Sequence, residues 1–270
     1  MASLLESLFK TKHPVIGMVH LAPLPGSPRW GGSMDRVLER ALVDAKALRR
    51  GGAHAFVIEN YGDLPFDGGS VEPACTAAMA VALRACREAT GLPAGVNVLR
   101  NDTAAALGVA IAGGAVFIRT NVHTGSMVGD QGILQGKAAT TMRERARLGA
   151  DGIAVFADIL VKHAVPLGER DPRRAAREAV ERGLADGLLA TGTATGARLD
   201  FRELAAIRDE VEAAPLLVAS GTTPRDMALI ASLADGVIAG TVLKVDGKTS
   251  NPVDPARVRA LVRAAAKAWR

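Results

Sequence analysis

The segment LLVASGTTP, residues 216–224, is an apolar run that ends in small polar residues and a proline. A second apolar run, GVIAGT at residues 236–241, ends in the same kind of glycine-bearing turn. Short apolar runs of this type are typical of parallel strands that are buried on both faces. The residues between them have room for a helix that begins at Pro224. The two runs therefore predict a strand–helix–strand unit.

The same alternation of strand and helix extends over the rest of the chain. Nearly continuous apolar runs predict six earlier strands, at residues 14–21, 55–60, 94–99, 116–120, 152–159 and 187–191. Amphipathic, alanine-rich segments predict a helix after each strand. These helices are expected at residues 33–50, 73–90, 102–114 (with Asp102 or Thr103 as N-cap), 137–148, 171–183 and 199–211, from Pro224, and from Asp254.

Eight strand–helix units in about 255 residues match a closed (β/α)8 barrel in number and in length. An open doubly wound sheet is the alternative, but no G-x-G-x-x-G motif follows the first predicted strand, where that fold would bind a dinucleotide. We therefore predict a single (β/α)8 TIM barrel of the phosphate-binding type. It spans residues 1–270, with residues 1–12 as a short N-terminal extension.

The composition is that of a soluble globular protein, with 49% hydrophobic and 23% charged residues. No apolar run reaches the roughly 18 residues needed to span a bilayer, and the N-terminus lacks the pattern of a signal peptide. We expect a cytoplasmic protein without integral membrane association. Aromatic residues make up only 3% of the chain, so stacking platforms for nucleic acid are not expected.

The most basic segment is ARVRALVRAAAKAWR, residues 256–270. Its apolar residues recur at helical spacing, which favours an outer helix with a charged face over a surface for an anionic partner or a membrane. The two cysteines, Cys75 and Cys86, fall in one predicted helix. They would lie roughly 16 Å apart, too far for a disulfide, and are expected to be packing thiols.

Polar side chains gather at the carboxyl ends of the predicted strands, where barrel enzymes carry their active sites. Glu59 or Asp158 would act as general acid and base, and Arg119 or His20 would stabilise a developing oxyanion. The structural alternative is that these charges only neutralise one another, as Arg119 would with Glu59 or Asp158. The candidate catalytic residues are His20, Glu59, Asn97, Arg119, Asp158, Lys162 and His163.

The glycine-bearing ends of the last strands predict a phosphate site. Small residues let backbone N–H groups approach an anion, and loops after the seventh and eighth strands commonly hold phosphate in this architecture. The alternative is that Gly221 and Gly240 only close tight turns. The candidate phosphate-binding residues are Thr191, Gly192, Thr193, Ser220, Gly221, Thr222, Gly240, Thr241 and Lys244.

No zinc-binding motif is present in the sequence. Oxygen atoms of Glu59, Asp158 and Asn97 could hold Mg²⁺, but their spacing does not require it. We therefore predict no metal site with Mg²⁺ as the alternative cofactor. The glycine-rich segment 121–136, with Asp130 and Gln131 near its tip, is expected to be a loop that covers the site or contacts a second subunit of a homo-oligomer.

Several ordered motifs resemble the BtpA/SgcQ family over residues 13–259: GMVHLAPLPGSP, GVNVLRND, FIRTNVHTG, DQGI, ADILVKHA, TGTATG and GTVLKVDGKTSNPVD. The resemblance implies a (β/α)8 barrel akin to the phosphate-binding kind. The family takes its name from a role in photosystem I biogenesis in cyanobacteria, whereas SgcQ-like relatives belong to sugar-metabolism settings in bacteria with no photosystem. The family has no agreed catalytic residues that could be carried over to this sequence.

Two functions therefore remain open. The first is an enzyme that binds a small phosphorylated sugar or nucleotide-like metabolite and acts as an isomerase, a lyase or a glycosyl or phosphoribosyl transferase. The second is a non-catalytic assembly or regulatory factor, of the photosystem I biogenesis type, that lies at a membrane surface. Fold alone does not choose between them.

Overall fold

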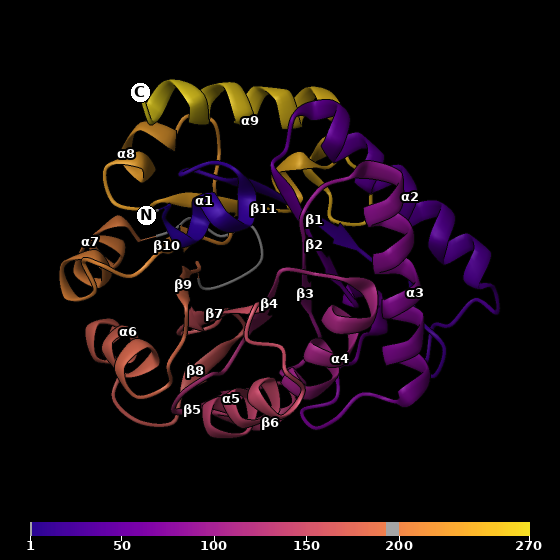
Figure 1. The fold of residues 1–270 in the computed structure, drawn as a ribbon, viewed down its shortest axis with the longest axis horizontal. Helices are drawn as coiled ribbons and strands as arrows, with labels where there is room; N and C mark the ends of the chain where they lie inside the picture. The colour runs from indigo at the N-terminus through magenta and orange to yellow at the C-terminus, as the bar shows by residue number, and fades with distance from the viewer. Residues whose placement is uncertain (1, 193–199) are drawn as a thin grey trace.

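The computed structural model describes residues 2–192 and 200–270 and contains a closed barrel of eight parallel strands (Figure 1). Successive barrel strands pair side by side, and the last strand pairs with the first. Each strand lies within a predicted one, which confirms the barrel. The strands are β1 (Val15–His20), β2 (Ala55–Glu59), β3 (Ala94–Asn97), β4 (Phe117–Thr120), β7 (Ala154–Ile159), β9 (Gly187–Ala190), β10 (Leu216–Val218) and β11 (Gly236–Ala239).

Helices form a layer around the barrel (Figure 1). Asp102 caps its helix as predicted, because its carboxylate accepts a hydrogen bond from the N–H of Ala105 at 3.0 Å. The helix expected from Pro224 begins later, because Thr223 binds Asp226 and forms a turn first. The helices are α2 (Met34–Gly51), α3 (Pro73–Thr90), α4 (Thr103–Gly113), α5 (Ala138–Arg147), α6 (Pro172–Glu181), α7 (Phe201–Glu210), α8 (Met227–Ala231) and α9 (Pro255–Ala268).

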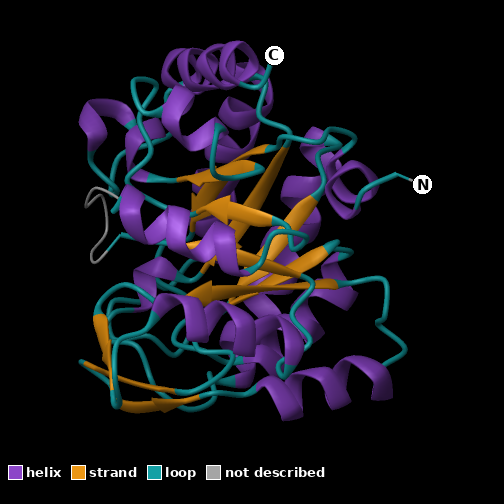
Figure 2. Ribbon diagram, turned by 90° about the vertical axis from the view of Figure 1, so that its left-hand side faces the viewer, coloured by secondary structure: helices purple, strands orange, loops and turns teal. Residues whose placement is uncertain are grey.

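The N-terminal extension contains a helix that the sequence analysis did not predict. Helix α1 (Leu4–Phe9) begins with a capping box between Ser3 and Glu6. Its buried Phe9 packs edge-on against Phe117 inside the barrel, with ring centroids 5.5 Å apart. The helix therefore covers the amino ends of the strands. Figure 2 shows the N-terminus on the side opposite to the strand arrowheads.

The segment 121–136 is a hairpin and not the expected loop. Strands β5 (Ser126–Gly129) and β6 (Gly132–Gln135) are antiparallel, and β8 (Ala164–Pro166) adds a third strand. The turn has Gly132 at φ +87°, a conformation that suits glycine. Met127 and Leu134 pack with Val122 and Val161 beneath it. The small sheet stands beside the carboxyl ends of the barrel strands (Figure 2).

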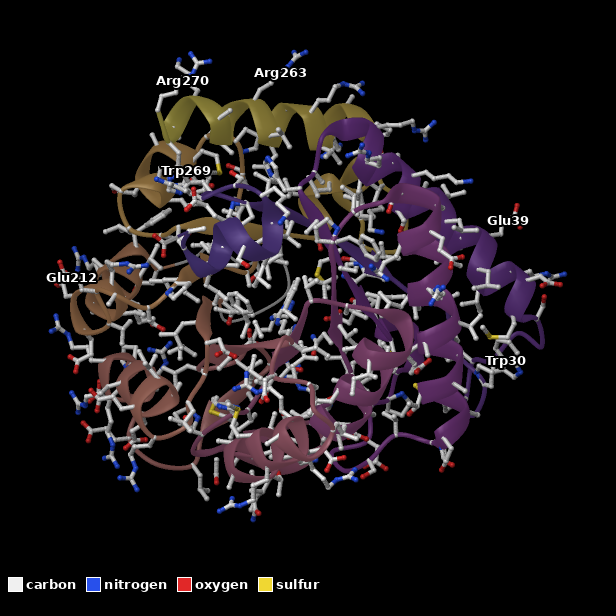
Figure 3. All side chains as sticks on the ribbon, in the orientation of Figure 1. Trp30, Glu39, Glu212, Arg263, Trp269 and Arg270 are labelled. Carbon is white, nitrogen blue, oxygen red and sulfur yellow. The ribbon has the colours of Figure 1, made fainter. Side chains whose placement is uncertain are left out.

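The basic C-terminal segment is an outer helix, as predicted. Val258, Leu261 and Ala265 of α9 are buried against the rest of the protein. Figure 3 shows Arg263 and Arg270 pointing away from the barrel, with Trp269 on the inner side. No helix among residues 2–192 and 200–270 has both the length and the apolar character needed to cross a membrane.

Both cysteines are buried free thiols on α3, as predicted. Burial raises the pKa of Cys75 and the pKa of Cys86 to about 12. The thiols therefore stay protonated at physiological pH and have little nucleophilic character.

Candidate active site at the barrel mouth

Two adjoining cavities open at the carboxyl ends of the barrel strands. The first, here called the glycine-rich cavity, has a volume of ≈ 260 Å³ and includes Gly221, Gly240 and Gly247 in its lining. The second, here called the amide-lined cavity, has a volume of ≈ 490 Å³ and includes Asn97, Asn121 and Gln131. Four side chains line both cavities, which makes them two parts of one site: Glu59, Tyr61, Arg119 and Lys162.

A buried ion pair fixes one wall of the site. Arg119 on β4 donates to both carboxylate oxygens of Asp158 on β7, with N–O distances of 3.0 to 3.2 Å. Asn121 donates a further hydrogen bond to Asp158 at 2.7 Å. Burial lowers the pKa of Arg119, but Asp158 and Glu59 outweigh that effect and raise it. Arg119 is therefore a permanent positive charge at the site.

The position of Asp158 corrects the prediction that it transfers protons. Its side chain is 0% exposed and is surrounded by the donors on Arg119 and Asn121. It does not line either of the two cavities. Arg119 does pair with Asp158, one of the two partners that the sequence analysis named for it. Asp158 acts by holding Arg119 and Asn121 in place.

Glu59 is the carboxylate that lines both cavities. Its Oε2 atom accepts a hydrogen bond from Asn97 Nδ2 at 2.6 Å. Its Oε1 atom lies 3.7 Å from His20 Nε2. Glu59 ends β2 and Asn97 ends β3, at paired positions in neighbouring strands. A carboxylate that one amide holds in place beside a cavity is suited to general acid–base chemistry.

His20, at the end of β1, contributes a neutral imidazole to the glycine-rich cavity. Burial lowers the pKa of His20 well below its usual range, and the charges of Lys244, Lys162 and Arg119 lower it further. The contact with Glu59 is consequently a polar contact and not an ion pair. The Nδ1 atom of His20 has no hydrogen-bond partner in the described part of the chain. The Nδ1 atom can therefore donate a hydrogen bond to a ligand or accept one from it, according to the tautomer.

Lys162 stands at the junction of the two cavities, three residues beyond β7. Burial lowers the pKa of Lys162, and the neighbouring Arg119 lowers it further. Its backbone oxygen accepts a hydrogen bond from Arg100 at 2.6 Å, which anchors the loop. An ammonium group with a lowered pKa gives up its proton more easily than an exposed lysine.

The turns after β10 and β11 form the inner wall of the glycine-rich cavity. Residues 220–223 and 240–242 all line it, so the structure brings together the predicted residues Ser220, Gly221, Thr222, Gly240 and Thr241. A Cβ atom at Gly240 would lie 3.2 Å from the ring of His20, so a side chain there would crowd the cavity. Thr222 Oγ1 is buried without a partner among the described residues.

Lys244 does not lie at the mouth, and the prediction that it binds phosphate is wrong. Its side chain is fully buried and forms an ion pair with Asp44 on α2. Asp44 also accepts a hydrogen bond from the N–H of Val253 at 2.7 Å. The short 3₁₀ helix η2 (Thr241–Leu243) follows β11, and its first two residues line the cavity while Lys244 after it does not.

The residues after β9 and β7 are only partly at the site. Thr191 and Gly192 line a separate cavity together with His163, although Gly192 N–H donates to Ser220 Oγ at 3.3 Å. His163 is exposed and also lies at the rim of the amide-lined cavity. Thr193 lies outside the described residues.

Other polar residues at strand ends hold loops together. Asn60 accepts from the N–H of Leu99 and donates to its oxygen, at 2.7 and 3.2 Å. Asn101 likewise accepts from the N–H of Val122 and donates to its oxygen, at 2.8 and 2.9 Å. These two asparagines tie each strand-end loop to the next one. They keep the rim of the barrel rigid around the site.

The structure adds site residues that the sequence analysis missed. Tyr61 follows β2 and stacks at a tilt on His20, with ring centroids 4.9 Å apart. Phe66 and Arg100 line the amide-lined cavity, and Arg257 of α9 lines the glycine-rich one. Arg100 directly follows the predicted strand 94–99 and Tyr61 directly follows the predicted strand 55–60, so strand-end position is the signal that could have found both. Phe66 lies farther along its loop and Arg257 lies on a helix.

The predicted oxygen set for Mg²⁺ does not form. Glu59 and Asn97 are in contact, but Asp158 is bound by Arg119 and Asn121. In the described ranges 2–192 and 200–270, no three His, Cys, Asp or Glu side chains gather where they could hold a metal ion.

The sequence is similar to that of other known proteins. The model of the BtpA family matches residues 11–267. The photosystem I biogenesis protein BtpA of Synechocystis is 41% identical over 96% of this chain and 90% of that protein. A protein of Thermococcus kodakarensis is 44% identical over 94% of this chain and 95% of its own length. The sgc region protein SgcQ of Escherichia coli is 34% identical over 95% of both chains.

Among solved structures, the barrel is similar to several enzymes of low sequence identity. Thiamine phosphate pyrophosphorylase of Pyrococcus furiosus superposes with a TM-score of 0.60 at 14% identity, covering 95% of this chain and 98% of that one. Orotidine 5'-phosphate decarboxylase of Pyrococcus horikoshii superposes with a TM-score of 0.57 at 14% identity, covering 93% and 99%. At this level of identity the likeness shows the fold.

Proposed function

This chain belongs to the BtpA family, and we propose that it is an enzyme that acts on a small organic phosphate at the mouth of its barrel. The phosphate occupies the glycine-rich cavity, and the organic part of the substrate occupies the amide-lined cavity. The observation that carries the proposal is the sharing of Glu59, Arg119 and Lys162 by both cavities. The reacting part of a bound substrate lies beside these groups.

The chemistry of the glycine-rich cavity supports a phosphate ligand. Its turns carry small residues, which allow a close approach of backbone N–H groups to an anion. Three cationic side chains line it, namely Arg119, Lys162 and Arg257. The names of two enzymes with a similar barrel refer to phosphate compounds, which agrees with this assignment. Lys244 has no part in it, because its side chain is buried against Asp44 and does not line the cavity.

Proton transfer is the chemistry that the shared wall supports best. Glu59 takes a proton from a carbon or oxygen atom of the substrate and returns it to another. Lys162 and the neutral His20 donate hydrogen bonds to the oxyanion that forms, while Arg119 supplies a fixed positive charge. This set fits isomerases and lyases that pass through an enolate or alkoxide. Arg119 does not exchange protons because it remains ionised.

A ligand screen by thermal unfolding tests this proposal. Phosphate esters of small sugars, polyols and nucleosides should raise the melting temperature by mass action, while their dephosphorylated forms should not. Glu59→Gln should keep the shift but lose turnover by roughly 10²–10⁴-fold, since general acid–base catalysis has that size. If no phosphorylated compound stabilises the protein, the enzyme proposal fails.

One observation favours a second function. The 41% identity with the photosystem I biogenesis protein of Synechocystis extends over nearly the whole chain. A non-catalytic assembly factor would use the barrel to bind a partner, and turnover would not be needed. In that case the Glu59→Gln variant would function as well as the wild-type protein in every cellular assay. A loss of function with Glu59→Gln would instead support the enzyme.

A further inference from the structure

The amide-lined cavity carries hydrogen-bond acceptors that no described residue uses. Asn97 Oδ1 and Asn121 Oδ1 are buried and have no partner in the described part of the protein. The two residues are 1% and 2% exposed, and both line this cavity. A buried acceptor without a partner raises the free energy of the folded state. Both oxygens belong to residues that line one cavity, which indicates that a ligand completes them.

The carboxylates behind the two amides fix which atom faces the ligand. Asn97 donates from Nδ2 to Glu59 at 2.6 Å, and Asn121 donates from Nδ2 to Asp158 at 2.7 Å. An ionised carboxylate can only accept, so each NH₂ group must lie on its carboxylate. The carbonyl oxygen of each amide is then the remaining atom. A ligand group that meets either oxygen must therefore be a hydrogen-bond donor.

The cavity also carries hydrogen-bond donors. Arg100, Arg119 and Lys162 line it as well, and Arg100 Nε is buried without a partner in the described residues. Glu59 and Asp130 line the cavity too, and Asp158 neutralises Arg119, so the charges are mixed and do not select an ion of one sign. The group that fits this lining donates to the amide oxygens and accepts from Arg100 and Lys162. A hydroxyl group does both.

We infer that the amide-lined cavity binds the polyhydroxylated part of the substrate, with hydroxyl groups donating to Asn97 Oδ1 and Asn121 Oδ1. This inference rests on the proposed function, which places the phosphate in the neighbouring cavity. It narrows the substrate class to phosphorylated polyols and sugars. Leu64, Phe66 and Leu99 also line the cavity and provide an apolar surface for the C–H face of such a carbon chain.

A series of ligands with the unmodified protein tests the inference directly. Ribitol 5-phosphate and pentyl phosphate have five carbons and one phosphate each, but only the first carries hydroxyl groups. Isothermal titration should give ribitol 5-phosphate a Kd at least about tenfold lower, since each correctly paired hydroxyl contributes a few-fold to tenfold. Equal affinities would overturn the inference and leave the phosphate site standing. If neither compound nor inorganic phosphate binds, the proposed function falls with it.

A variant series assigns the effect to the amide oxygens. Asn121→Leu removes the acceptor at nearly constant volume, together with one of the donors to Asp158, whose bonds from Arg119 remain. It should weaken ribitol 5-phosphate about tenfold and leave pentyl phosphate unchanged. The control Asn251→Leu changes an amide that binds the backbone of Val245 outside both cavities, and it should alter neither Kd. An equal loss for both ligands with Asn121→Leu would overturn the inference. So would a melting-temperature rise with Mg²⁺ alone that Asn121→Leu abolishes.

Discussion

Glu59 combines two properties that rarely occur together in one carboxylate. It is only 5% exposed, yet it lines both cavities of the site. Asn97 holds one of its oxygens, and Asn97 itself is held at the end of the neighbouring strand. Asp158 also lies near the end of its strand, but it is fully occupied by Arg119 and Asn121. The two carboxylates therefore have different roles because of their partners.

The buried neutral state of His20 gives the protein an acid-sensitive stability. Burial, followed by the charges of Lys244 and Lys162, lowers the pKa of His20 in the folded chain. Below about pH 6.5 the unfolded chain binds a proton at this position and the folded chain does not. The free energy of unfolding must therefore fall as the pH drops below that value.

We expect His20→Gln to reduce this dependence by up to one proton, or about 1.4 kcal/mol per pH unit. Urea unfolding between pH 5 and pH 7 measures it. The matched variant is His123→Gln. Burial lowers the pKa of His123 too, but its ring contacts the backbone oxygen of Gly183 and lies outside both cavities. An unchanged slope in His20→Gln would show that His20 is already protonated in the folded state.

The sequence predicted part of the site at the level of single residues. Glu59, Arg119 and residues 220–222 were found because strand ends in a parallel barrel meet at one face. Lys244 was placed wrongly because its partner, Asp44, is 200 positions away in the sequence. A local pattern contains no information about such a pair. Arg257 was missed for a similar reason, because it reaches the cavity from helix α9 and not from a strand end.

At the scale of the elements, the packing inside the barrel requires glycines next to large side chains. A Cβ atom at Gly95 of β3 would lie 2.2 Å from the ring of Phe117, and one at Gly187 of β9 would lie 2.4 Å from the ring of Phe156. The two rings contact each other at 5.4 Å between centroids. The glycines therefore make room for two phenylalanines inside the barrel.

Gly95→Ala should consequently destabilise the protein by about 1–3 kcal/mol, because the added methyl group overpacks a closed interior. The matched control is Gly108→Ala on α4, where a Cβ atom meets nothing within 4 Å. That change should be neutral or stabilising by up to about 1 kcal/mol, since alanine favours the helix. Urea unfolding of both variants measures the difference. Equal effects would contradict the packing account.

Some local sequence patterns were enough to predict a helix or a strand, and others were not. All eight barrel strands were predicted, because each is a nearly continuous apolar run. The hairpin of β5 and β6 was expected to be a loop, because the four glycines of segment 121–136 conceal the pairing of Met127 with Leu134. Helix α1 was not predicted because six residues are too few to show a period. Its stability comes from packing beneath the barrel.

For the whole molecule, the ion pair between Lys244 and Asp44 links the last strand–helix unit to the first. Lys244 follows β11, Asp44 lies on α2, and Val253 N–H binds the same carboxylate just before α9. The pair is completely buried. Removal of one partner would leave a charge in the core without compensation.

Lys244→Met should therefore destabilise the protein by about 3–5 kcal/mol. The double variant Lys244→Met, Asp44→Leu should recover much of this loss, because no charge then remains buried. Chemical unfolding of the two variants and of Asp44→Leu completes a double-mutant cycle. A double variant as unstable as the sum of the two single variants would show that the residues act independently.

The β5–β6 hairpin has a consequence for how the specificity of this protein can change. Its turn residues Asp130 and Gln131 line the amide-lined cavity. Within the described part of the chain it pairs with β8 and with no barrel strand. Its tip can therefore be lengthened, shortened or exchanged without shifting the register of the barrel. The hairpin is therefore a part of the cavity lining that can be exchanged independently of the barrel. New substrates could be accommodated by grafting a different turn, while the proton-transfer groups stay where they are.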